Sequence, residues 1–142
     1  MNQGLRSRLP ALPHPHLIWL RSAATVLLSC LIAQAGWASA FLGGEGLYLD
    51  HHRVGAWVTL VVAVLSALVY VVLRRSAGPV NVGLALAVAV AVTVQATLGE
   101  LGGHRALHIF LGVLLTMLGT ALTSWTYRHR MPEERPAPTS SP

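Results

Sequence analysis

Four stretches of the chain are long and apolar enough to cross a lipid bilayer as helices. A helix needs about 20 mostly apolar residues to span the hydrocarbon core. The stretches that meet this requirement run from about 17 to 42, 54 to 73, 80 to 98 and 107 to 127. Lipid offers the backbone no hydrogen bonds, so each stretch is expected to be helical despite its many valines. The sequence therefore predicts an all-α, integral membrane four-helix bundle.

The composition excludes a small water-soluble bundle. Of the 142 residues, 54% are hydrophobic and 11% are charged, far from the averages of soluble domains. The transmembrane domain is predicted to cover residues 17–130, between two flexible ends at 1–16 and 131–142 that contain proline-rich segments. The single cysteine, Cys30, cannot form an intrachain disulfide.

The arginines predict the orientation of the helices. All ten basic residues are arginines, and a four-span arrangement leaves only Arg53 and Arg105 on one side. Basic residues concentrate on the cytoplasmic side of membrane proteins, so both termini and a turn at 74–79 are predicted to be cytoplasmic. The chain is thus expected to be a multi-pass protein of the cell membrane. Because the arginines lie at segment ends and form no continuous basic face, a nucleic-acid partner is not expected.

The first stretch also has features of a secretory signal. Arginines precede an apolar core, and Ala38-Ser39-Ala40 imitates a cleavage site of small residues. The apolar stretch is long for the core of a signal, and an internal repeat uses its residues. We therefore expect the first span to be retained.

That repeat consists of two similar helical hairpins. In the first, Gln34 precedes a Gly-Gly pair, a His-His-Arg segment and Gly55. In the second, Gln95 precedes a Gly-Gly pair, two further histidines and Gly112. Each hairpin is therefore predicted to place histidine near the start of its second helix.

The seven histidines fall into two groups. Those near the termini, among prolines or arginines, are predicted to be solvated: His14, His16 and His129. Ionisable groups near the hydrocarbon usually serve a function. The four that meet this description converge on the outer ends of the second and fourth spans: His51, His52, His104 and His108.

Imidazoles from two facing helices are suitable axial ligands for heme iron. Gly55 follows His51, and Gly112 follows His108, by one helical turn on the same face, where small residues leave room for a flat macrocycle. Arginine pairs well with carboxylates, so Arg53 and Arg105 are candidate partners of the heme propionates. The predicted cofactor is heme b.

Short motifs of the chain resemble the heme A synthase family. The segment Gln95-Ala-Thr-Leu-Gly99, followed by Leu107-His108 opening an apolar helix, is similar to one four-helix half of that family. His52-Arg53 at the second span is similar as well. In that family, histidines on the second and fourth helices of each half ligate or approach heme. The resemblance covers about 17–130 and implies His52 and His108 as ligands, whereas the internal repeat favours His51 over His52.

The chain also departs from that family. It has a single four-helix half, so it would have to dimerise to hold two hemes. Leu49 stands where the family has an acidic residue, three positions before His52, and the paired cysteines of some members are absent. The resemblance therefore favours heme binding over methyl oxidation of heme, and an independent enzyme is not expected.

Three functions follow from these patterns. The first is a small cytochrome b-like protein for electron transfer or heme handling, and the second is a non-catalytic membrane scaffold or accessory subunit. The third is a metal-ion binder that uses His104 and His108, which are four apart on one helix face. The expected partners are the lipid bilayer and either a second copy of the chain or a membrane redox protein.

Overall fold

The structure, a computed structural model, describes residues 14–131, and these form four long helices and no strand. The helices are α1 (Pro15–Leu42), α2 (Leu47–Val72), α3 (Arg74–Leu101) and α4 (Arg105–Arg128). All four are long and apolar enough to cross a membrane. The predicted all-α four-helix bundle is therefore confirmed. The predicted flexible ends lie outside the described residues, except for 14–16 and Met131.

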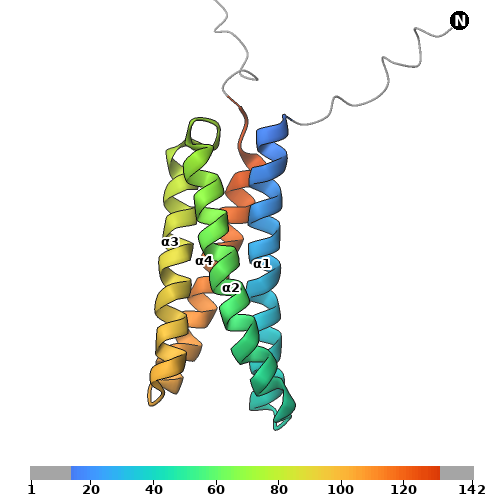
Figure 1. The fold of residues 1–142 in the computed structure, drawn as a ribbon, viewed down its shortest axis with the longest axis vertical. Helices are drawn as coiled ribbons and strands as arrows, with labels where there is room; N and C mark the ends of the chain where they lie inside the picture. Colours follow the sequence, from blue (N-terminus) through green and yellow to red (C-terminus); the bar gives the residue numbers. More distant parts are fainter. Residues whose placement is uncertain (1–13, 132–142) are drawn as a thin grey trace, which may run out of the picture.

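The helices run side by side along the length of the molecule (Figure 1). Each helix packs against the next one in the chain, and α1 also packs against α4, so that the bundle closes into a ring. The α1–α2 hairpin and the α3–α4 hairpin diverge toward the loops that join their helices (Figure 1). The predicted pair of hairpins is thus visible as two arms.

The helices begin and end where the local sequence requires it. Pro15 occupies the first turn of α1, where its missing N–H costs nothing. Gly102, at a φ of 64°, ends α3 in a conformation that side chains rarely adopt. At the other end of the bundle, Gly78 has a φ of 76° and kinks the start of α3 immediately before Pro79. The predicted turn at 74–79 is therefore a kinked helical segment, and α2 and α3 are separated by Leu73 alone.

Burial divides the bundle into two ends. We call residues 32–54 and 93–114 the histidine end and the rest of the described bundle the terminal end. Every buried residue of the part described lies at the terminal end, and residues 32–54 and 93–114 contain none. The core comprises mainly leucines, valines and alanines around one tyrosine: Leu20, Leu27, Leu31, Ala63, Tyr70, Ala77, Ala85, Val88, Val92, Leu115 and Leu122.

Candidate functional site

The histidine end brings two of the predicted ligands together. His52 lies in the second turn of α2 and His108 in the first turn of α4, so they belong to different hairpins. Their ring centroids are 6.1 Å apart, and the ring planes are nearly perpendicular at 86°. Both residues are half-buried. Long-range packing of the two hairpins therefore places two imidazoles at the same depth of the bundle.

The surroundings of His52 fix its protonation pattern. Its Nδ1 lies 3.2 Å from the main-chain oxygen of Gln34 in α1. A carbonyl oxygen can only accept a hydrogen bond, so Nδ1 must carry the proton and donate it. Nε2 is then left with a free lone pair. Metal-binding histidines commonly use this arrangement, because the bond at one nitrogen orients the ring and raises the basicity of the other.

The ring of His108 is closely surrounded by residues of α3 and of its own helix. Its Nδ1 is buried and has no hydrogen-bond partner within residues 14–131. Gly99 of α3 faces the ring, because a Cβ at that position would lie 3.2 Å from Cε1 of His108. The main-chain oxygen of His108 accepts a hydrogen bond of 2.6 Å from Nε2 of Gln95. The ring is thus held in a narrow space by its own helix and by α3.

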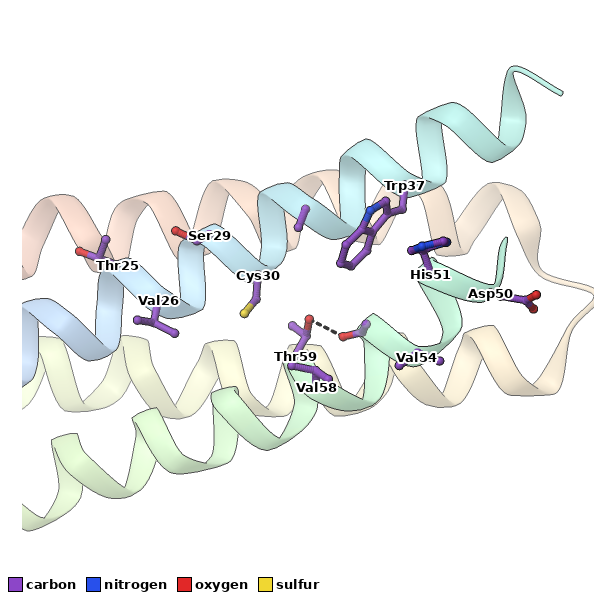
Figure 2. Close-up of a pocket in the computed structure, with 12 residues that line it drawn as sticks. Thr25, Val26, Ser29, Cys30, Trp37, Asp50, His51, Val54, Val58 and Thr59 are labelled. Carbon is purple, nitrogen blue, oxygen red and sulfur yellow. Dashed lines mark hydrogen bonds between the residues drawn. The ribbon is translucent and has the colours of Figure 1, made fainter. Parts of the chain in front are cut away.

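The other two predicted histidines lie elsewhere. His51 has its Nδ1 3.1 Å from the main-chain oxygen of Leu47, and its ring lies 6.2 Å from that of Trp37. Figure 2 shows both rings in a groove of about 690 Å³ between α1 and α2, on the outside of the bundle. His104 is the exposed residue immediately before α4. Neither residue belongs to the pair that joins the hairpins.

The two glycines near the histidines accommodate glutamine side chains. A Cβ on Gly55 would collide with Nε2 of Gln34 and with the ring of Trp37. A Cβ on Gly112 would lie 3.1 Å from Nε2 of Gln95. In both hairpins, therefore, a glutamine of the first helix packs over a glycine of the second. Each glycine thus makes room for an amide in this structure, and the role of both beside a macrocycle stays a prediction.

A threonine completes the repeated unit in each hairpin. Thr59 donates a 2.7 Å hydrogen bond to the oxygen of Gly55, and Thr116 donates one of 3.0 Å to the oxygen of Gly112. The Gly-x-x-x-Thr spacing is common to both hairpins and is a signal in the sequence that the histidines alone did not provide. Counting from the glycine makes His51 the counterpart of His108. The pairing of His52 with His108 therefore breaks the repeat by one residue.

Arg53 and Arg105 are exposed and lie beside this region in sequence, next to His52 and His104. Neither arginine has a hydrogen bond or an ion pair within residues 14–131. Both guanidinium groups therefore remain available to an anionic group that reaches this end of the bundle.

Unpartnered polar atoms concentrate in this region. Four buried side-chain nitrogen or oxygen atoms of the described residues have no hydrogen-bond partner. Three of these are at the histidine end: Nε2 of Gln34, Oε1 of Gln95 and Nδ1 of His108. Buried polar groups are normally paired, and an unpaired one calls for an explanation such as a bound group.

A second polar cluster, at the terminal end, was not foreseen from the sequence. The hydroxyl of Tyr70 donates to the oxygen of Leu20 at 3.1 Å and lies 2.6 Å from Oγ1 of Thr126. Oγ1 of Thr126 also lies 3.4 Å from Oδ1 of Asn81, to which it donates when its proton is not directed at Tyr70. These bonds connect all four helices inside the bundle. Polar side chains that bond across helices are a common means of association within membranes.

The terminal histidines require a correction. His16 has its Nδ1 2.8 Å from the hydroxyl of Ser76, and His129 has its Nε2 2.8 Å from the main-chain oxygen of the same residue. Both rings are half-buried rather than solvated, because each contacts Ser76 in the first turn of α3. Proline and arginine neighbours in the sequence gave no sign of this tertiary contact.

The number of ligating side chains that lie together limits the kinds of group that the described residues can hold. Within the described part of the chain, no group of three or more His, Cys, Asp or Glu side chains is close enough to hold a metal ion. Zinc sites in proteins use three or four protein ligands. A heme brings its own four nitrogen ligands and needs at most two imidazoles from the protein. His52 and His108 supply two imidazoles, and the predicted metal-ion site at His104 and His108 stays a prediction.

Comparisons with known proteins do not add a family to this description. No protein-family model, no curated protein and no solved structure matches the chain.

Proposed function

We propose that this chain is a small membrane heme-binding protein of the cytochrome b type, with heme b held between α2 and α4 by His52 and His108. The observation that carries the proposal is the approach of these two rings from different hairpins, with centroids 6.1 Å apart and ring planes at 86°. Two imidazoles on opposite sides of one metal atom have centroids about 6 Å apart, because each metal–nitrogen bond is about 2 Å long.

Three further features support the proposal. Nε2 of His52 is the ring nitrogen without a hydrogen bond, since Nδ1 donates its hydrogen bond to the oxygen of Gln34. Residues 32–54 and 93–114 contain no buried core, and many of their large apolar side chains are exposed. Arg53 and Arg105 are exposed and unpaired at the same end, where they would meet the propionates.

The bound heme would supply reversible one-electron chemistry. The protein's own residues would orient His52 through Gln34, confine His108 against Gly99 and keep the iron within an apolar bundle. Such a protein would serve electron transfer or heme handling, together with a second copy of itself or a membrane redox partner. No enzyme activity of its own is proposed.

We further propose that the chain lies in the cell membrane with both termini in the cytoplasm. Within residues 14–131, five arginines lie at the terminal end: Arg21, Arg74, Arg75, Arg128 and Arg130. Only Arg53 and Arg105 lie at the histidine end. The positive-inside rule then directs the histidine end to the outer face.

The absorption spectrum tests the heme proposal directly. Protein purified from heme-replete cells should show a Soret band that shifts on reduction. His108→Ala and His52→Ala should each abolish it or reduce its intensity at least tenfold, because each removes an axial ligand. His51→Ala and His104→Ala are matched controls from the same helices and should retain the band. A colourless wild-type protein would refute the proposal, and loss of the band in His51→Ala alone would move the ligand to the neighbouring residue.

A membrane scaffold is the second candidate, and one observation favours it. The hydrogen bonds of His52 to Gln34 and of Gln95 to His108 already tie neighbouring helices together without a cofactor. If that is their whole role, alanine at all four outer histidines should lower stability modestly and change no spectrum. Metal analysis of the same samples would reveal a bound metal ion without heme.

A further inference from the structure

The terminal end contains a charged residue within an apolar helix. Arg21 is the seventh residue of α1 and lies inside the membrane-compatible segment. Its guanidinium lies over the ring of Tyr127, 5.3 Å from the centroid, and Nη2 donates a long 3.4 Å bond to the oxygen of that residue. Its Nε is buried and has no partner within residues 14–131. Ionisable residues in such segments usually have a functional role and a specific partner.

No carboxylate of the described residues compensates this charge. The acidic residues within 14–131 are Glu45, Asp50 and Glu100, and all three lie at the histidine end. The terminal end has five arginines and no acid within the same range. An arginine next to hydrocarbon is stabilised when an anionic group with oxygen acceptors pairs with it.

The surroundings of Arg21 have the polarity of a lipid headgroup site. A crevice of about 390 Å³ lies between α1 and α4 and is lined by Ile18, Arg21, Ser22, Thr25, Val26 and Tyr127. The hydroxyls of Thr25 and Tyr127 line the same crevice as Arg21 and share a hydrogen bond of 3.1 Å, which leaves one of their two protons for another acceptor. Ile18 and Val26 are about half exposed on the outer surface of the bundle, at 48% and 52%. Apolar surface thus continues directly from the polar groups.

Neighbouring residues mark this level as the edge of the hydrocarbon. The guanidinium of Arg128 lies 5.2 Å from the ring centroid of Trp125, which is 48% exposed. Tryptophan and tyrosine concentrate where hydrocarbon meets the headgroups. A phosphate at the depth of Tyr127 is therefore where a phospholipid would present it.

We propose that the crevice around Arg21 binds the phosphate of an anionic glycerophospholipid from the leaflet at the terminal end. Arg21 supplies the charge and planar donors, the hydroxyls of Ser22, Thr25 and Tyr127 contact headgroup oxygens, and Ile18 and Val26 contact the first part of an acyl chain: these six residues define the site. Basic pockets between helices on the cytoplasmic side commonly take anionic lipids. This inference does not depend on heme binding.

The test is a comparison of lipids in one detergent. Full-length protein is titrated with phosphatidylglycerol or phosphatidylcholine, bound lipid is counted by native mass spectrometry, and the melting temperature is followed. Wild-type protein should bind phosphatidylglycerol preferentially and melt at a higher temperature with it. Arg21→Gln should weaken phosphatidylglycerol binding about fivefold, as expected for one cationic contact. Arg128→Gln, an equal loss of charge beside the crevice, is the control and should retain most of the preference.

The other results of this experiment either support the lipid site or overturn it. The lipid preference is measured within each variant, so a general loss of stability in Arg21→Gln does not imitate loss of the site. Thr25→Val with Tyr127→Phe keeps the charge and should weaken binding through the lost hydroxyls. Equal binding of both lipids by wild-type protein overturns the proposal, as does saturation by inorganic phosphate at the same concentration. If the preference for phosphatidylglycerol appears only after Glu133→Gln and Glu134→Gln, the partner of Arg21 is a carboxylate of the chain's own tail and not a lipid phosphate.

Discussion

The two ends of the bundle are built on different principles. At the terminal end, apolar residues from all four helices are buried, and the polar groups of Tyr70, Thr126 and Asn81 bond to one another. At the histidine end no residue of 32–54 or 93–114 is buried, and three buried polar atoms lack partners. The first end is packed on itself except at the crevice around Arg21, whose Nε has no partner within the described residues. The second lacks both a buried core and partners for these three atoms.

The residues that stabilise the fold and the residues of the proposed site therefore lie at different ends of one bundle. Lipid is as apolar as leucine, so helices in membranes associate through close packing and hydrogen bonds. Both are concentrated at the terminal end, which therefore supplies most of the stability of the fold. The histidine end, where we propose that His52 and His108 bind heme, has less buried packing.

The largest expected effect compares two leucines of α4. Leu122 is 1% exposed at the terminal end, and Leu114 is 43% exposed at the histidine end. Leu122→Ala should lower the free energy of unfolding by about 2 kcal/mol, since it leaves a cavity among four helices. Leu114→Ala should lower it by less than about 0.5 kcal/mol, as expected for a surface position.

Unfolding in mixed micelles with increasing denaturing detergent measures both values. The two variants delete the same atoms from the same helix, so helix propensity changes equally in each. Losses of equal size would mean that the histidine end is packed as firmly as the terminal end, and the comparison would fail.

The next effect concerns the polar network. Tyr70→Phe removes the hydroxyl that bonds the oxygen of Leu20 and the side chain of Thr126. We expect a loss of about 1 kcal/mol, because hydrogen bonds between membrane helices contribute about 0.6 kcal/mol on average and two are lost. Thr97→Val is the control, since Thr97 bonds only to the oxygen of Thr93 within its own helix. If both variants are equally stable in the same micelle assay, the polar network does not contribute to the greater stability of the terminal end.

Hydropathy was sufficient to predict the fold, because a bilayer permits few structures. The four helices lie where the apolar stretches predict them, and each extends beyond its stretch by some residues. The largest extension at a single helix end is in α2, which begins at Leu47 rather than at residue 54. The helix continues through a polar segment that the hydrophobic pattern could not include. Helix length is thus set partly by backbone hydrogen bonding outside the hydrocarbon.

The candidate site was less predictable, because it depends on how the hairpins approach each other. The sequence pointed to the histidine end but left His51 and His52 open, and the repeat favoured the residue that lies in the outer groove. A shift of one residue rotates a helical side chain by about 100°. Only the packing of α2 against α1 and α3 determines which of two adjacent rings faces α4. The contact of His16 and His129 with Ser76 likewise has no local signature.

The smallest expected effect tests the histidine end most specifically. Gly99→Ala adds a methyl group 3.2 Å from Cε1 of His108, so the ring must shift by a few tenths of an ångström. The added Cβ favours the helix and should leave stability unchanged or slightly raised. If His108 binds heme iron, heme affinity should fall about threefold, equivalent to about 0.7 kcal/mol, and the low-temperature spectrum should broaden. Gly83→Ala, on the same helix with open space around its Cβ, should change neither. Identical heme affinities in the two variants would mean that the ring of His108 is not confined by α3 when heme is bound, and that this end adapts to its ligand instead of being preformed.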